Sequence, residues 1–513
     1  MEFDWESFFK NNRKKYKHID APIPAYRLPN GTISNAAENI IKYITNIDKI
    51  AKHPFLPFIG YAIEERRISK IDKTKPRDQQ ESIIKSRPIR YAAHFDSMIF
   101  SYYAAILYDL YEKKLSKLGL DDVVLAYRKS EYMHKTANNI TFAREVFDII
   151  KNRNNNCIAL AFDIKSFYDY IDHKNLKQQW AALLSGDEAC DTLPPDHFNI
   201  YKTLTKYNFV DMNVIKMYLQ CPHCTPSAKT CANCPLRKGY KLPQKLFNNM
   251  SDFHKFRQWY KEYQKICNKE TTNIPTFDVN PGVQDTNAPY GIPQGSPLSA
   301  LLANIYMLPF DKSMKDYCDN HNAVYRRYSD DILIICDKSS KEEIYLHIMK
   351  AINENGKHLF IHPITDNKRS KSKCYDFTSK KIIEEPLQYL GFTFDGRDVK
   401  IRGSSMARYL RKSKRGIRSM RLATQHKLKQ LVEKGYSPKK FKSKLYRRTL
   451  YNNYTHLGKR NFWSYVNRAF DDMGDITLKK QMRKHFERVK KLIDAEDMEL
   501  NKFLTALTNE PLN

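Results

Sequence analysis

Short apolar runs alternate with longer stretches of helical spacing through the middle of the chain. The runs CIALAFDI (157–164), AVYRRYSDDILIIC (323–336) and LQYLGFTF (387–394) have the length and the β-branched and aromatic content typical of strands. Helical stretches separate these runs along the sequence. Strands separated by helices predict a mixed α+β core.

Helical patterns dominate on both sides of these strands. The segment HFDSMIFSYYAAILYDLYEKKL (94–115) is apolar on most sides and predicts a buried helix, while TKPRDQQESIIKSRPIR (74–90) predicts a loop entering a strand. Beyond residue 401, apolar residues such as Tyr409, Ile417 and Met420 recur at helical spacing. The sequence therefore predicts a C-terminal domain made of helices.

The charge of the chain predicts the kind of partner that it binds. The 513 residues include 87 Lys or Arg and 57 Asp or Glu, a net charge of +30. Residues 401–460 hold 19 of the basic residues and a single acid, Glu433. A merely solvated helix usually mixes signs to form pairs four residues apart, so this excess favours a polyanionic partner, and nucleic acid first. An anionic membrane surface is the competing interpretation.

Membrane insertion is not expected. No run of about 18 apolar residues is present to span a bilayer. The first ten residues, MEFDWESFFK, are too acidic and too poor in apolar residues for a signal peptide. We therefore expect no membrane association and a cytoplasmic location.

Two sites combine carboxylates with strand-like runs. Asp330 and Asp331 lie between two such runs, where a tight hairpin would hold both at its tip, and Asp163 ends the apolar run of 158–162. An isolated Asp at a strand end is more often a cap or a turn residue. Two such sites on one sheet instead predict a shared divalent cation, and magnesium prefers oxygen ligands of this kind.

The cysteines predict a different metal. Four of the ten fall within CPHCTPSAKTCANC (221–234), with the spacing Cys-x2-Cys-x6-Cys-x2-Cys. Free thiols or a redox pair are possible, but four thiolates in two knuckles favour tetrahedral zinc in a structural site, and His223 could replace one sulfur. The predicted zinc ligands are Cys221, Cys224, Cys231 and Cys234.

Together these segments resemble the ordered motifs of reverse transcriptases. Residues 162–165 (FDIK), followed by the aromatic Tyr168, resemble motif A, and YGIPQGSPLSALLANIYM (290–307) resembles motif B. Tyr-Ser-Asp-Asp at 328–331 resembles motif C, and 387–394 is similar to the hairpin that follows the palm. The resemblance implies a right-hand polymerase with fingers, palm and thumb and an antiparallel palm sheet.

The resemblance also implies roles for single residues. Asp163, Asp330 and Asp331 would bind two magnesium ions, with the backbone carbonyl of Ile164 as a further ligand. The ring of Tyr168 would lie under the incoming sugar and exclude a ribonucleotide by clashing with its 2′-hydroxyl.

Further positions would contact the nucleotide. Gln294 and Gly295 match the loop that touches the nascent base pair, and the glycine permits a close backbone approach.

Basic residues are candidates for binding the triphosphate. Arg128 matches a triphosphate-binding arginine of the fingers, and Arg87 is a second candidate. Either arginine could instead form a surface ion pair. Lys368 and Lys371 compete for the lysine that would assist the leaving pyrophosphate.

The motifs divide the chain into four parts. We predict an N-terminal extension over 1–84, fingers over 85–155, a palm over 156–395 and a helical, RNA-binding thumb over 396–513. The stretch between motifs A and B is longer than the family core requires, so the palm is expected to carry an insertion at about 175–285 that contains the cysteines.

The expected activity is RNA-directed DNA polymerisation with deoxynucleotide triphosphates on an RNA template, giving a cDNA product. The chain looks most like the stand-alone bacterial defence-associated and abortive-infection reverse transcriptases, which implies a cognate non-coding RNA, a role in antiphage defence and a possible homo-oligomer. Two rivals stay open: a group II intron-like maturase, and a catalytically silent RNA-binding scaffold that keeps the palm shape.

Overall fold

A computed structural model describes residues 3–13, 23–68, 82–128, 131–132, 135–154, 156–212, 289–365, 370–378, 385–437 and 444–509. The chain has the mixed α+β architecture that the sequence predicts. The strands are β1 (Phe58–Ile68), β2 (Ser82–Tyr91), β3 (Glu131–Tyr132), β4 (Lys135–Thr136), β5 (Ile158–Asp163), β6 (Phe209–Asp211), β7 (Val324–Tyr328), β8 (Asp331–Cys336), β9 (Lys373–Asp376), β10 (Leu387–Tyr389), β11 (Phe392–Phe394) and β12 (Val399–Ile401).

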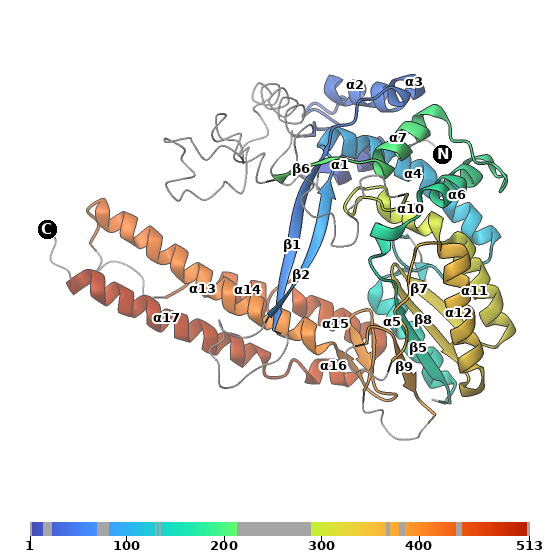
Figure 1. Ribbon diagram of the computed structural model, residues 1–513. Helices are drawn as coiled ribbons and strands as arrows, with labels where there is room; N and C mark the ends of the chain where they lie inside the picture. Colours follow the sequence, from blue (N-terminus) through green and yellow to red (C-terminus); the bar gives the residue numbers. More distant parts are fainter. Residues whose placement is uncertain are drawn as a thin grey trace.

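Helices surround these strands (Figure 1). They are α1 (Trp5–Arg13), α2 (Asn35–Ile44), α3 (Ile47–Ala51), α4 (His94–Lys117), α5 (Asn139–Asn152), α6 (His173–Ser185), α7 (Pro195–Thr205), α10 (Ser299–Tyr306), α11 (Leu308–Asn320), α12 (Lys341–Gly356), α13 (Gly403–Glu433), α14 (Arg447–Tyr454), α15 (Phe462–Met473), α16 (Ile476–Lys480) and α17 (His485–Asn509), with 3-10 turns η1 (Phe167–Tyr170) and η4 (Lys338–Ser340). Among the described helices, none has the length and apolar character needed to cross a membrane.

The central sheet has the order β7-β8-β5-β9, and all its neighbours are antiparallel, which confirms the predicted antiparallel sheet. Alternate residues point to opposite faces. Leu160 and Ile334 join the core with α11 and α12, whereas Ala159 and Leu333 join a second core with α5. Both faces are buried, which explains why the two central strands, β5 and β8, are apolar almost throughout.

A long hairpin of β1 and β2 rises from a second sheet, in which β6 pairs in parallel with β1. Gly60 permits this pairing, because a Cβ there would lie 2.5 Å from the ring of Phe209. The hairpin differs from the predicted domain division, since the boundary at residue 84 falls inside β2. Residues 175–212, placed in the predicted insertion, form most of α6 together with α7 and β6 and pack with the rest of the fold.

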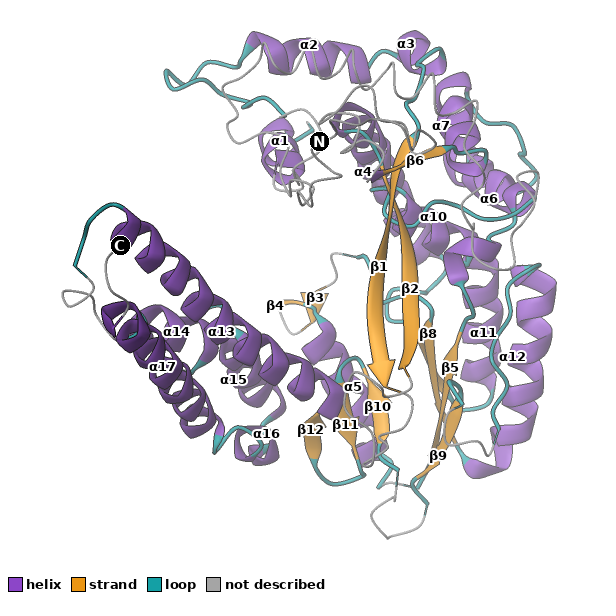
Figure 2. Cartoon of the chain, turned by 60° about the vertical axis from the view of Figure 1, so that its left-hand side comes forward, coloured by secondary structure: helices purple, strands orange, loops and turns teal. Residues whose placement is uncertain are grey.

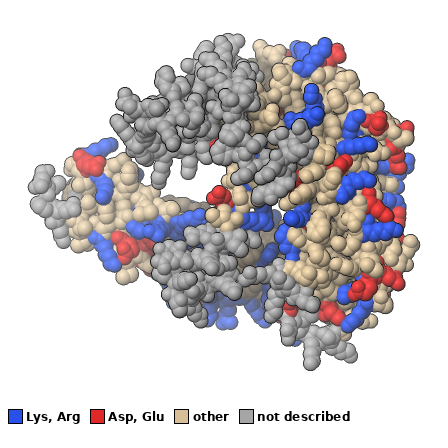
Figure 3. Space-filling view, in the orientation of Figure 1, with Lys and Arg blue, Asp and Glu red and all other residues tan. Residues whose placement is uncertain are grey.

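The C-terminal helices form an arm whose first helix, α13, starts at Gly403. α13 packs along α17 through a core that includes Ile417, Leu428, Val489 and Ile493. Figure 2 shows this arm facing the β1–β2 hairpin. In the space-filling view, Lys and Arg side chains gather along the α13 side of the hollow between them (Figure 3).

Candidate active site

The hairpin between β7 and β8 is the tight turn that the sequence predicts. Tyr328 pairs with Asp331, so Ser329 and Asp330 alone form the turn. Ser329 has φ of 60°, a conformation that favours glycine at the first central position of such turns. A non-glycine residue held there indicates a position that the surrounding structure fixes.

Three carboxylates meet at this end of the central sheet. In the antiparallel ladder of β5 and β8, Asp163 lies directly opposite Asp331. The next residue, Ile164, donates its backbone N–H to the carbonyl of Asp330 over 3.1 Å. The two Asp sites, 167 positions apart in the sequence, are thus brought together as expected.

Burial and mutual repulsion raise the pKa of two of these carboxyl groups. Burial, then Asp330 and Asp163, raise the pKa of Asp331 to about 7, while Arg402 and Lys371 oppose the rise. Burial and the charge of Asp163 also raise the pKa of Asp330, against the lowering effect of Arg87. A cation bound between them would relieve this repulsion.

At Asp163, a lysine ammonium already supplies a positive charge beside the carboxylate. Lys371 Nζ lies 2.8 Å from Asp163 Oδ2, and His362 Nε2 lies 3.7 Å from the same oxygen. Within the described ranges no three Asp, Glu, His or Cys side chains converge closely enough to hold one ion. The donor set still fits magnesium in kind, because it consists of carboxylate and carbonyl oxygens. The competing Lys368 lies outside the described residues.

Tyr168 stands beside the carboxylates, on η1. Its hydroxyl lies 3.5 Å from the hydroxyl of Tyr127. Burial, then the neighbouring Tyr127 and Asp330, raise the pKa of Tyr168, while a hydrogen bond with Ser329 lowers it. The ring is therefore placed next to the turn that carries Asp330.

The Gln294–Gly295 loop closes another side of the site. The carbonyl of Gln294 accepts a hydrogen bond of 2.8 Å from the N–H of Arg90 in β2. Gly295 has φ of 117°, and a Cβ there would lie 2.9 Å from Ile89 Cγ2. Both the dihedral angle and the close approach to β2 require glycine, whereas the sequence predicts a close approach to the substrate, which stays a prediction.

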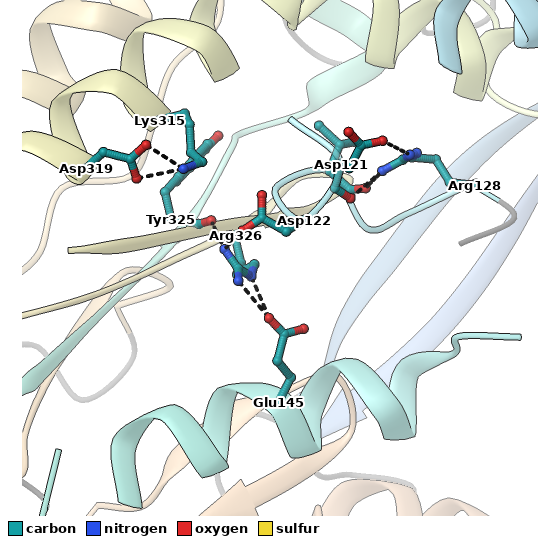
Figure 4. A network of polar contacts seen from close by, with 9 residues as sticks. Asp121, Asp122, Arg128, Glu145, Lys315, Asp319, Tyr325 and Arg326 are labelled. Atoms are coloured by element: carbon teal, nitrogen blue, oxygen red, sulfur yellow. Dashed lines mark hydrogen bonds and ion pairs between the residues drawn. The ribbon is translucent and has the colours of Figure 1, made fainter. Parts of the chain in front are cut away.

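The two candidate arginines are placed differently from the order that the sequence favours. Arg128 is 4% exposed, and its guanidinium donates to Glu112, to Asp121 and to the carbonyl of Val124. Figure 4 shows its contact with Asp121. All five N–H groups are used, so none is available for a phosphate. Arg87, on the exposed part of β2, acts electrostatically on Asp330 instead.

A buried network that the sequence reasoning missed supports the turn. Arg327 and Asp311 form an ion pair with both side chains 0% exposed, at 2.6 Å and 2.7 Å. Arg327 also donates to the carbonyl of Ser329 and to Asn304, and Tyr325 donates to Asp311. The available signal was a charged residue inside a strand-like run and an acid directly after the apolar run that ends at Phe310.

The predicted zinc ligands Cys221, Cys224, Cys231 and Cys234, and His223, lie outside the described residues. Within the part of the chain that is described, the thiols are free, in agreement with reduced cysteines; they are Cys157, Cys190, Cys318, Cys336 and Cys374.

Comparison with protein families identifies one match. Residues 240–394 match the family described as reverse transcriptase (RNA-dependent DNA polymerase). The matched part includes Gln294, Gly295, Asp330, Asp331 and Lys371 and begins after Asp163. It supports an RNA-directed DNA polymerase domain, over less than a third of the chain. No curated protein matches the chain.

Solved structures of telomerases also align with the chain. The apo telomerase from Candida tropicalis truncated from its C-terminal domain is 11% identical with a TM-score of 0.34, and the alignment covers 62% of this chain and 54% of that one. The Candida albicans telomerase with a fragment of telomeric RNA is 11% identical with a TM-score of 0.33, over 97% of this chain and 68% of that one. The apo Candida tropicalis telomerase is 12% identical with a TM-score of 0.30, over 72% of this chain and 52% of that one. The alignment thus spans about half the length of the Candida tropicalis chains. At these TM-scores the similarity carries no argument about function.

Proposed function

We propose that this chain is an RNA-directed DNA polymerase that extends a primer with deoxynucleotides by a two-magnesium mechanism. The observation that carries the proposal is the position of Asp163 directly opposite Asp331, the neighbour of Asp330, at one end of the central sheet, the latter two within the part that matches reverse transcriptases. The pKa values of Asp330 and Asp331 are raised, and perturbed carboxyl groups of this kind cluster at functional sites.

The residues divide the chemistry between them. Asp163, Asp330, Asp331 and the carbonyl of Ile164 would hold magnesium, which when bound stabilises the attacking and leaving oxygens of phosphoryl transfer. The primer 3′-hydroxyl attacks the α-phosphate, and pyrophosphate leaves. Lys371, released from Asp163, is placed to neutralise charge on the leaving group.

Around this centre the pocket selects and orients the nucleotide. Arg87 replaces Arg128 in our proposal as the arginine that binds the triphosphate, because its guanidinium is on the exposed side of β2. Gln294 and Gly295 contact the nascent base pair, and the ring of Tyr168 blocks a 2′-hydroxyl.

The basic arm would grip the nucleic acid. The face of α13 away from α17 exposes a row of cations, and neutralising phosphates by such residues provides affinity without sequence preference. These residues are Arg408, Arg411, Lys412, Lys414, Arg415 and Arg418. We place the RNA template and its growing cDNA beside these cations, along the hollow that Figure 3 shows.

Three finer parts of the proposal rest on the sequence. A cognate non-coding RNA as template and a role in antiphage defence are implied by the resemblance, and a structural zinc on Cys221, Cys224, Cys231 and Cys234 is inferred from the cysteine spacing. Sequencing the RNA that co-purifies, together with the DNA made on it, separates a dedicated transcript from the intron RNA that a maturase would carry.

A primer-extension assay tests the activity. Purified protein, magnesium, a primed RNA template and labelled deoxynucleotides should give extended product, and the double substitution Asp330→Ala, Asp331→Ala should abolish it while RNA binding persists. A wild-type protein that binds the template but extends no primer would favour the silent scaffold instead.

A further inference from the structure

Tyr127 is an exposed aromatic residue in a backbone conformation that bulky side chains seldom adopt. Its φ is 62° and its side chain is 55% exposed. A bulky residue in the left-handed region is a genuine outlier, and such strain persists only where the surrounding structure imposes it. Since the side chain is not needed to fill the core, the conformation requires another explanation.

The turn that carries Tyr127 is held from three directions. On one side, Arg128 fastens it to Glu112 and to the carbonyls of Asp121 and Val124. On the other, the carbonyl of Ala126 accepts a 3.0 Å hydrogen bond from Asn304. The preceding residues Val123 and Leu125 exchange backbone hydrogen bonds with Arg327 in β7. The turn is therefore rigid up to the residue before Tyr127 and from the residue after it.

This rigid turn presents Tyr127 to the nucleotide pocket. The hydroxyl of Tyr127 lies 3.5 Å from that of Tyr168, at the long end of hydrogen-bond distances. Tyr168 contacts Ser329 on another side. The ring of Tyr168 thus lies between a fixed hairpin turn and a second fixed turn that contacts it through Tyr127.

We propose that Tyr127 is a positioning residue for sugar discrimination. Its hydroxyl holds the Tyr168 ring where that ring excludes the 2′-hydroxyl of an incoming ribonucleotide. This inference rests on the proposed polymerase function and deepens it, since it assigns the accuracy of the gate to a residue 41 positions before it. The strain at Tyr127 is then retained because a left-handed residue at this position aims the hydroxyl at the gate.

The test compares single-nucleotide incorporation from a deoxynucleotide and from the matching ribonucleotide. Selectivity is the ratio of the two kcat/KM values. Tyr127→Phe removes only the hydroxyl and should lower selectivity about two- to tenfold, the range expected for one net hydrogen bond. Tyr436→Phe, a tyrosine that is 60% exposed beyond the end of α13, is the matched control and should leave selectivity unchanged.

A second variant separates positioning from damage to the fold. Tyr127→Gly suits the positive φ, so its thermal midpoint should equal or exceed that of the wild type while selectivity falls at least as far as in Tyr127→Phe. Equal losses for both nucleotides, or unchanged selectivity in both variants, would overturn the inference. So would a wild type that incorporates both nucleotides equally. A wild type that incorporates neither overturns the polymerase proposal itself, and the two failures are thereby distinguished.

Discussion

Removing the carboxylate of Asp311 should destabilise the whole central region, because it leaves the guanidinium of Arg327 buried without its partner. Both side chains are 0% exposed, and two hydrogen bonds of 2.6 Å and 2.7 Å join them. Breaking a buried ion pair from one side typically costs about 3–5 kcal/mol. We expect Asp311→Ala to lower the free energy of unfolding by about this amount.

The same helix provides a matched control. Lys315 and Asp319 form an i,i+4 ion pair on α11, with Asp319 53% exposed (Figure 4). Exposed pairs contribute about 0–1 kcal/mol, so Asp319→Ala should change the free energy of unfolding by less than about 1 kcal/mol. Chemical denaturation of the two variants, followed by circular dichroism, measures the contrast. Equal losses of unfolding free energy in the two variants would contradict the conclusion that the buried guanidinium of Arg327 depends on Asp311.

A double variant then separates stability from positioning. Replacing both partners, as Asp311→Leu with Arg327→Met, removes the stranded charge and should recover most of the lost stability, since apolar replacements of buried pairs are often neutral or better. Primer extension should not recover, because the hydrogen bond from Arg327 to the carbonyl of Ser329 is gone and the Asp330 turn loses its support. Full recovery of both properties would refute the positioning role.

Three other predictions follow from the site. Asp331, whose pKa burial and its acidic neighbours raise to about 7, holds its proton more tightly in the folded chain, so its contribution to stability without metal is present below about pH 4 and is lost as the pH rises through 7, while magnesium binding strengthens. With EDTA, the thermal midpoints of wild type and Asp331→Asn should therefore approach each other toward pH 5 and separate toward pH 8, and a difference that stays constant over this range would mean that the pKa is not raised. Arg87→Ala should raise the KM for deoxynucleotides about tenfold with little change in thermal midpoint. Arg128→Ala should instead lower the free energy of unfolding by about 2–4 kcal/mol. A raised KM in Arg128→Ala together with a lost stability in Arg87→Ala would restore Arg128 as the phosphate ligand. Elemental analysis of gently purified protein should find about one zinc per chain, and Cys224→Ser should remove it; zinc-free native protein excludes the site.

The sequence predicted the features that depend on local patterns. Apolar runs bounded by charged turns predicted β5, β7 and β8, and their antiparallel pairing places Asp163 opposite Asp331 because a buried strand tolerates only one register. The positive φ of Gly295 concerns the backbone of the loop itself and suits the glycine of the motif, whereas its close approach to Ile89 of β2 could not be stated in advance.

Features that depend on distant partners could not be predicted in this way. The sequence favours Arg128 over Arg87 as the phosphate ligand, and only the positions of Glu112 and Asp121 show that Arg128 is fully used. Likewise, the boundary expected at residue 84 falls inside β2. Composition marks the start of this strand as a loop, whereas the structure pairs it with β1. Tertiary contacts decide both cases, and single-sequence patterns do not contain them.

The buried charge of Arg327 links the two strained turns of the site. Its guanidinium donates to the carbonyl of Ser329, and its backbone N–H and carbonyl bond to the segment that leads to Tyr127. An apolar residue in β7 could fill the same volume but could not reach the turn carbonyl and Asp311 at once. The free-energy cost of desolvating a polar network in a core is offset where the network fixes one arrangement among several of similar packing. Here the arrangement it fixes sets the distance between the carboxylates and the aromatic gate, so we expect substitutions in this network to change nucleotide selectivity and catalysis together, whereas substitutions at Tyr127 change selectivity alone.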